Sequence, residues 1–501
     1  MIAFRTSFAL LPNMSLFNRI HASVGLSLIA MLVVSLPIRA NELPDLGESS
    51  RAVLSPQLER RIGESIMNEI RLREPAYVDD PEINDYLSRL GERLVQASEN
   101  PTGEFHFFAI RENSINAFAM FGGYIGVNTG TLLAAQSESE LASVLAHEIA
   151  HVTQDHLARQ IAKEKQNTIP SLIAMAVGIL AARSNSSVAA ATITSAQAGM
   201  VQSQLAYTRD FEREADRLGY QTLERADFDV RAMGDFFERL QKAGHLYENN
   251  APVYLRSHPL TVERISDMQN RAQNSPYRQV VSSLEFHLVR AKLQAQAGTP
   301  VEALRAFEAR LNERKFISEV ATRYGLLVSL MRAKKIAEAQ RELGSLIALK
   351  VSSPMIAGMA AEIKNAAGDK AAAQTIYREA LQHFPKSQSL VYGYAEALFG
   401  AGKHDQALQF IRSQVQQNVF DYKLYGMQAK NYAALGKRLQ QHRAQAEYYF
   451  LQGQLGPAIE QLQFAQKSTD GDFQEQSAVD ARLRELRKLQ AEEDKRRRNG
   501  G

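Results

Sequence analysis

The sequence predicts an α+β, mainly helical protein with two domains, a globular domain at 41–275 and an all-α repeat domain at 276–490. The full chain has 501 residues, a length typical of two or three domains. Near residues 272–277 the composition changes to alanine-rich helical pairs without strand-like segments. We place the domain boundary there, and we expect a basic disordered tail at 491–501.

The N-terminal segment has the features of a secretion signal. Arg19 precedes an uncharged apolar run at 24–36, and the small residue Ala40 follows shortly after it. A basic flank, a short apolar core and a small residue at its end describe a signal peptide, here at 1–40. Spanning a bilayer takes about 20 apolar residues, so this run is short for a permanent anchor. We therefore expect a secreted chain, with Met14 as an alternative start.

Cysteine content and charge exclude some classes of function. The chain has no cysteine, and its formal net charge is +3. The lack of cysteine excludes a thiolate zinc site and a cysteine protease. A secreted chain of this size has enough core to fold without disulfides. The small net charge says little about partners, and we expect no nucleic acid among them.

A stretch at 141–152 has apolar residues at helical spacing and contains His147-Glu-Ile-Ala-His151. On a helix, residues i and i+4 lie on one face, so both imidazoles can bind one metal ion. Glu148 follows the first histidine, where its carboxylate can take a proton from a water molecule on the metal. This is the H-E-x-x-H pattern of zinc hydrolases. The alternative is a chance match on a surface helix.

A second helical stretch, at 207–220, supplies candidate carboxylates. A catalytic zinc ion needs three protein ligands and one open position, so an acidic residue from a second helix would complete the site. Glu212 and Asp216 share a helix face, whereas Glu214 is expected to point roughly the opposite way. If Glu212 binds the metal, Asp216 is placed to orient a ligand histidine or to handle a proton. An ordinary charged face, paired with nearby arginines, is the alternative.

Together, the two motifs resemble the zinc metallopeptidases that include the HtpX heat-shock proteases and the CAAX prenyl endoproteases. Two further segments fit that family. The stretch 116–128 resembles the strand that precedes the zinc helix and lines the substrate cleft, and 257–265 resembles the closing His-Pro…Arg-Ile segment. The resemblance covers roughly residues 55–275 and implies a zincin-type metallopeptidase domain.

The resemblance also implies roles for individual residues. It implies one Zn²⁺ ion per chain, with Glu148 as the general base and Asp216 as a proton-handling partner. Three metal ligands are implied, namely His147, His151 and Glu212.

Two other histidines need separate interpretation. His258 matches a residue that acts as a switch in periplasmic relatives with tetratricopeptide repeats. As a fourth ligand it would displace the catalytic water and silence the enzyme, so His258 is a candidate inhibitory ligand. His156, a turn and a half beyond His151, is expected either on the surface or beside a metal ligand.

An apolar insert at 166–206 lies between the two metal-binding helices. Its first apolar run covers 171–182, and its second, at 187–201, contains Ser, Thr and Gln. Neither has the length and polarity of a membrane-spanning helix. We expect a helical hairpin beside the active site that serves as a lid, with a peripheral contact to a membrane as the alternative.

Small residues recur in 276–490 with a 34-residue period. Gly368, Gly402 and Gly436 follow it, and Lys334 occupies the equivalent position with the glycine replaced. A 34-residue period is the tetratricopeptide pattern, in which glycine makes the turn and alanines let the helices approach. Stacked hairpins of this kind build a solenoid with a concave binding face. A generic helical bundle is the alternative, but a bundle has no reason to keep the period.

The order of signal peptide, zinc peptidase, apolar insert and repeats resembles periplasmic peptidases of the same superfamily. The resemblance implies a periplasmic enzyme, free or associated with the outer membrane, that degrades stalled outer-membrane proteins and assists their assembly. The implied partners are unfolded or stalled outer-membrane proteins and, through the repeats, the barrel-assembly machinery. Two alternatives remain: a chaperone or scaffold with a latent zinc site, and a peptidase that serves another envelope pathway. An intact Glu148 argues against a vestigial site.

Overall fold

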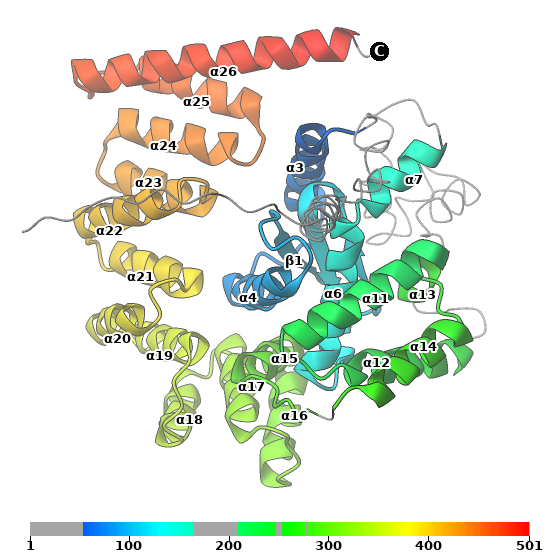
Figure 1. The fold of residues 1–501 in the computed structure, drawn as a ribbon. Coiled ribbons are helices and arrows are strands. Elements are labelled where there is room, and N and C mark those ends of the chain that lie inside the picture. Colours follow the sequence, from blue (N-terminus) through cyan, green and yellow to red (C-terminus); the bar gives the residue numbers. More distant parts are fainter. Residues whose placement is uncertain (1–53, 165–208, 247–252, 277, 500–501) are drawn as a thin grey trace, which may run out of the picture.

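The computed structural model describes residues 54–164, 209–246, 253–276 and 278–499 (Figure 1). The predicted signal peptide at 1–40 and the apolar insert at 166–206 lie outside these residues. Within the described ranges, no helix is both long and apolar enough to cross a membrane.

The N-terminal domain consists of helices around a small sheet with the strand order β1-β3-β2. β1 pairs with β3 in parallel, with His106 opposite Tyr124, and β2 pairs with β3 antiparallel, with Ala119 opposite Ile125. The elements are α3 (Pro56–Arg73), α4 (Pro81–Ala97), β1 (His106–Ile110), β2 (Ala117–Ala119), η1 (Phe121–Gly123), β3 (Tyr124–Asn128), α5 (Thr129–Ala134), α6 (Glu138–Thr153), α7 (His156–Glu164), α11 (Arg209–Arg225), α12 (Arg231–Leu246), α13 (Val253–Ser257) and α14 (Val262–Asn274).

The segment at 116–128, expected as a single strand, is a short hairpin. The 3-10 turn η1 joins β2 to β3, and Gly122 and Gly123 have φ angles of 70° and 75°. A Cβ atom on Gly123 would overlap the carbonyl oxygen of Glu104, so only glycine fits there. The chain therefore reverses within the segment. In the order β1-β3-β2, β2 is an edge strand among the strands of the described residues.

The repeat domain is all-α, as expected. Its helices stack in sequence order and curve around the N-terminal domain, with α3 and α4 on the inner side of the curve (Figure 1). The helices are α15 (Leu284–Gln296), α16 (Pro300–Asn312), α17 (Glu319–Arg332), α18 (Ile336–Ala348), α19 (Pro354–Ala366), α20 (Lys370–His383), α21 (Gln388–Gly400), α22 (His404–Gln417), α23 (Tyr422–Ala434), α24 (Arg438–Phe450), α25 (Leu455–Gln466) and α26 (Phe473–Asn499). Helix α26 continues to Asn499, through most of the segment expected as a disordered tail.

The 34-residue period is visible in the backbone turns between helices. Gly368, Gly402 and Gly436 adopt left-handed conformations with φ angles of 89°, 74° and 71°. Lys334 adopts the same conformation, with φ of 58°. For a residue with a Cβ atom this conformation costs about 1–2 kcal/mol. Lys334 therefore keeps the turn geometry of the repeat at a conformational cost.

One hydrophobic core extends from the N-terminal domain into the first repeats. It joins Leu145 of α6 to Leu327 of α17 and Ile363 of α19. The later repeats contain separate smaller clusters, and Leu462 of α25 belongs to one of them. The helices α15 to α19 thus share a core with the N-terminal domain, although they belong to the repeats by sequence.

A charged cluster fixes the start of α4 to the first repeats. Lys292 Nζ of α15 lies 2.7 Å from Asp80 Oδ2 and 2.6 Å from Glu82 Oε2. The hydroxyl of Tyr324 in α17 donates a hydrogen bond to Glu82 Oε2 at 2.9 Å. The three charged side chains are only 11–16% exposed. They tie two helices of the repeats to one helix of the N-terminal domain.

Two further contacts join α4 and the loop before it to the later repeats. The carboxylate of Asp85 accepts a hydrogen bond from the backbone N–H of Gln388, the first residue of α21, at 3.1 Å. Lys423 of α23 forms an ion pair with Asp79. An acidic side chain from one domain thus binds the N-terminus of a helix in the other, where backbone N–H groups are free of partners within the helix.

The connection between the domains is bound to the N-terminus of α6. Glu138, the first residue of α6, accepts hydrogen bonds from the backbone N–H of Ser283 at 2.8 Å and from its hydroxyl at 2.6 Å. The backbone N–H of Glu138 donates to Ser282 Oγ at 2.9 Å. Ser283 is also the N-cap of α15. One residue therefore joins the start of α6 to the start of the repeats.

Candidate metal centre

Helix α6 carries the predicted zinc motif through the interior of the N-terminal domain. Almost its whole length is buried, so it is not the surface helix of the chance-match interpretation. Gly219 allows α11 to approach it closely, since a Cβ atom there would lie 3.1 Å from the backbone N of His147. The two helices therefore hold His147, Glu148 and His151 in a buried position.

Helix α11 brings Glu212 to the two histidines. Glu212 Oε1 lies 3.4 Å from His151 Nε2, and its Oε2 lies 3.5 Å from His147 Nε2. The two Nε2 atoms are 3.0 Å apart. The three predicted ligands thus converge on one point from two helices.

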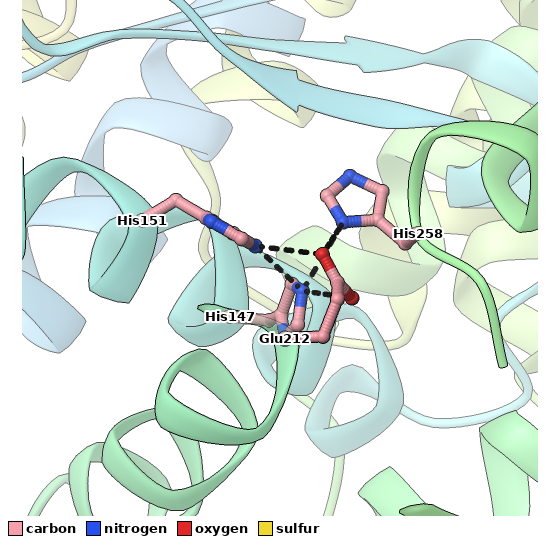
Figure 2. Close-up of side chains that lie close together, drawn as sticks. All are labelled: His147, His151, Glu212 and His258. Atoms are coloured by element: carbon pink, nitrogen blue, oxygen red, sulfur yellow. Dashed lines mark hydrogen bonds and ion pairs between the residues drawn. The ribbon is translucent and has the colours of Figure 1, made fainter. Parts of the chain in front are cut away.

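His258, directly after α13, joins the same cluster (Figure 2). Its Nδ1 lies 3.3 Å from His147 Nε2 and 3.0 Å from Glu212 Oε1. The imidazole stacks on the buried ring of Tyr254, with centroids 4.6 Å apart. One ligand atom from each of the four residues lies within 4.8 Å of all the others. His258 therefore offers a fourth possible ligand atom for a metal ion. We refer to these four ligand atoms as the donors.

The donor set fits a metal ion. Two imidazole nitrogens that face each other at 3.0 Å repel through their lone pairs unless a cation or a proton lies between them. Burial alone would lower the pKa of His147, but hydrogen bonds to Asp216 and Glu212 raise it to about 9. The cluster therefore favours a positive charge at this point. Imidazoles with a carboxylate suit zinc and other divalent transition metals, so the cluster could hold a metal ion, and its geometry does not fix which one.

Glu148 lies beside the cluster and is fully buried. Its Oε1 is 3.4 Å from His258 Nε2. Burial raises the pKa of Glu148 above its ordinary value, although His258 and His147 act in the opposite direction. A carboxylate that binds a proton more readily than usual is suited to accept one during a reaction.

Asp216 contacts His147 on the side away from the cluster. Its Oδ1 lies 3.0 Å from His147 Nδ1, and this contact directs Nε2 toward the other donors. Arg264 of α14 donates two hydrogen bonds to Asp216, at 2.6 and 2.8 Å, and lies 2.7 Å from Glu212 Oε2. Burial alone would raise the pKa of Asp216, but the hydrogen bonds from Arg264 lower it, so Asp216 stays ionised. The sequence showed Arg264 only as part of the closing segment and gave no sign of this pairing.

A second chain of contacts supports His151. His156, the first residue of α7, is buried, and its Nδ1 lies 2.8 Å from His151 Nδ1. Glu214 accepts from the other ring nitrogen of His156 at 3.0 Å, and Arg159 pairs with Glu214 at 3.1 Å. Of the two positions that the sequence left open for His156, the structure shows the one beside a ligand. Glu214 points away from the donors, as expected, but its carboxylate holds His156.

The sequence is similar to known peptidases along most of its length. Residues 81–272 match the model of Peptidase family M48, and residues 365–430 match a tetratricopeptide repeat model. A β-barrel assembly-enhancing protease of Escherichia coli strain K12 is 32% identical over 486 residues, which cover 95% of this chain and 98% of that protein. The protein of that name from Yersinia pestis is 30% identical over 448 residues, with 89% and 92% covered. Mitochondrial metalloendopeptidase OMA1 of Schizosaccharomyces pombe is 29% identical over 185 residues, with 37% and 51% covered.

Proposed function

This chain belongs to the β-barrel assembly-enhancing proteases, and we propose that it is a zinc-dependent endopeptidase of the periplasm, free or associated with the outer membrane. In this proposal it degrades misassembled or stalled outer-membrane proteins, and its repeats assist their assembly. The observation that carries the proposal is the buried set of four donors beside Glu148. The segment at 1–40 and the names of the relatives support the location and the substrate class.

The residues of the cluster and their neighbours would have different roles in peptide hydrolysis. His147, His151 and Glu212 would hold the zinc ion, which would polarise the scissile carbonyl and lower the pKa of a water molecule. Glu148 accepts the proton of the attacking water and then delivers it to the leaving amine. Asp216 and His156 keep the two imidazoles oriented with Nε2 toward the centre.

The edge strand β2 supports an endopeptidase acting on unfolded chain segments. An extended segment can pair with an edge strand through backbone hydrogen bonds, whatever its side chains. β2 packs on α6, the helix that carries Glu148. A segment added there would run past the donors with its backbone held in one register.

His258 would keep the enzyme inactive in the arrangement described. Its Nδ1 takes the position of a fourth donor, and its Nε2 faces the base Glu148 at 3.4 Å. An active enzyme needs this position for water and substrate. We therefore expect His258→Ala to raise the rate of proteolysis, and an unchanged or lower rate would count against the switch.

The direct test is casein degradation by the mature, zinc-loaded chain and by its Glu148→Gln variant. Cleavage by the wild type that is lost in the variant is the expected result. Equal cleavage by both proteins would point to a contaminant and remove the assignment of Glu148. If neither cleaves casein, and His258→Ala does not restore cleavage, the chaperone or scaffold alternative is favoured.

The partners follow from the repeats, which in general bind other proteins. We propose that they dock on the barrel-assembly machinery and hold unfolded client proteins near the metal site, where tethering raises the local concentration of the client. A pull-down from envelope membranes tests this. Recovery of barrel-assembly components supports the proposal, whereas recovery of cell-wall or lipid enzymes favours the other envelope pathway.

A further inference from the structure

Exposed apolar side chains are concentrated along one edge of the repeats. Single exposed apolar residues are normal on a protein surface, but a concentration of them usually marks a binding site. Six of the twelve large apolar side chains that are exposed among the described residues lie in the connections α16–α17, α18–α19 and α22–α23, or in the helical turn just before them. We call this set the apolar edge. It consists of Ile317, Ile347, Leu349, Val351, Val419 and Phe420, which are 36–88% exposed.

The repeat pattern places these side chains in a row. In a stack of antiparallel helices, every second connection lies on the same edge. Ile317, Val351 and Val419 are separated by one and two periods of 34 residues, so they occupy equivalent places in their repeats. The repeat between the last two has Pro385 at this place. Helices α16 to α23 pack against their neighbours in sequence order (Figure 1), which brings the equivalent connections side by side.

Basic side chains accompany the apolar edge. Arg314, Lys350 and Lys386 lie in three successive connections on this edge, and all three are exposed and form no ion pair within the described residues. Glu313 is already paired with Lys315 at 2.7 Å, and the stretches 343–361 and 380–395 contain no acidic residue. These connections therefore present positive charge beside the apolar side chains.

This combination fits a lipid surface better than a protein surface. The apolar centre of a protein–protein interface is poor in lysine. At a membrane surface, by contrast, apolar side chains enter the boundary between headgroups and acyl chains while lysine and arginine contact anionic headgroups. The apolar side chains also come from separate connections, and a fluid lipid boundary can take up each of them individually.

We propose that the apolar edge binds the surface of a membrane that contains anionic phospholipids. The apolar side chains would enter the headgroup boundary, and Arg314, Lys350 and Lys386 would contact lipid phosphates. The biological setting rests on the proposed association with the outer membrane, for which this edge supplies a defined surface. The repeats, and not the metal site, then face the lipid.

The test is flotation of the mature chain with phosphatidylcholine vesicles that contain, or lack, phosphatidylglycerol. We expect the vesicles with phosphatidylglycerol to bind at least tenfold more tightly. Binding should weaken at high salt, because ions screen the attraction between the basic side chains and the lipid.

A matched pair of lysines locates the charged part of the site. Lys350→Gln should weaken binding about fivefold, the equivalent of one lysine at an anionic membrane surface. Lys334→Gln is the control and should leave binding unchanged. Both lysines are exposed and left-handed, with φ of 53° and 58°, but Lys334 lies in the connection α17–α18, on the opposite edge.

Insertion of the apolar side chains has its own readout. The chain has no tryptophan, so a single introduced one reports on its surroundings. The fluorescence of Ile317→Trp should shift to the blue with phosphatidylglycerol vesicles and be quenched by brominated lipids. Val301→Trp is the control, since Val301 is 52% exposed at the start of α16, on the opposite edge, and its fluorescence should not change. Circular dichroism confirms that each variant is folded.

Three results would overturn the proposal: no binding to vesicles with phosphatidylglycerol, equal weakening by Lys350→Gln and Lys334→Gln, or the same fluorescence response in Ile317→Trp and Val301→Trp. A response of Ile317→Trp to an unfolded outer-membrane protein but not to vesicles would also overturn it, because the edge would then bind protein. None of these readouts involves cleavage, so their outcome is separate from that of the proposed peptidase activity.

Discussion

The first and the last repeats of this chain follow one sequence pattern but are stabilised differently. Helices α15 to α19 share a continuous hydrophobic core with the N-terminal domain, whereas α20 to α26 contribute mainly to small local clusters. In a solenoid each unit normally depends on its neighbours alone. The stability of the first repeats therefore depends on the N-terminal domain as well. We expect a destabilising substitution in α15 to α19 to affect the metal site.

The largest effect is expected from removing a buried leucine of the shared core. Leu327→Ala should lower the free energy of unfolding by about 3–5 kcal/mol and increase hydrogen exchange in α6. Leu462→Ala is the matched control, since both side chains are fully buried. It should raise exchange in α24 to α26 only. Equal increases in α6 for both variants would remove the distinction between the two groups of repeats.

The next effect concerns the charged cluster between the domains. Lys292→Met leaves Asp80 and Glu82 without their cation at 11–16% exposure, and we expect a loss of about 2–4 kcal/mol. Burial already raises the pKa of Glu82, so uptake of a proton limits the loss.

The ion pair of Arg482 with Glu447 in the last repeats provides the control for the Lys292→Met substitution. Arg482→Met breaks the pair with Glu447, which is 22–23% exposed, and should cost about 1 kcal/mol or less. Urea denaturation measures both variants. A cost for Arg482→Met equal to that for Lys292→Met would contradict the comparison.

A pH-dependent effect is expected where α4 meets the later repeats. Burial raises the pKa of Asp85 to about 6, from an ordinary value of 3.8. Between these values the folded protein binds the proton more tightly than the unfolded chain, so the contribution of Asp85 to stability falls as pH rises from about 4 to 6. Asp85→Asn cannot titrate, and its stability relative to wild type should rise over that window by about 3 kcal/mol and then stay constant. Denaturation at several pH values checks this, and a difference that stays flat would contradict it.

The smallest effects concern the turns of the repeats. Lys334→Gly relieves a left-handed backbone and should stabilise the protein by about 1 kcal/mol. Gly402→Ala is the reverse change in the later repeats. An added Cβ there meets nothing within 4 Å, so its cost of about 1 kcal/mol comes from the backbone alone. Melting temperatures should move in opposite directions, and a shared direction would disprove the assignment of strain to Lys334.

Local periodicity made the grouping of the candidate ligand residues predictable. The i, i+4 spacing of His147 and His151, and of Glu212 and Asp216, is a property of single helices and can be read from the chain. The turn at Lys334 was predictable in the same way, because the period fixes its place.

Contacts between distant helices were not predictable. Arg264 reaches Asp216 only because α14 packs beside α11, and Glu214 serves His156 only because α7 turns back toward α11. The reversal at Gly122 and Gly123 depends on a close approach to Glu104 that spacing does not encode. These arrangements depend on packing across the fold, for which a single sequence gives no direct signal.

The hydrogen bonds between Glu138 and Ser283 connect the start of the repeats directly to α6, the helix that carries Glu148. A client that pulls on the solenoid would transmit tension through Ser283 to the first turn of α6, whose last turns carry His147 and His151. A helix behaves as a stiff rod and transmits such a force along its axis. Mechanical work done by a captured chain could thus reach the hydrolytic centre without any diffusing effector.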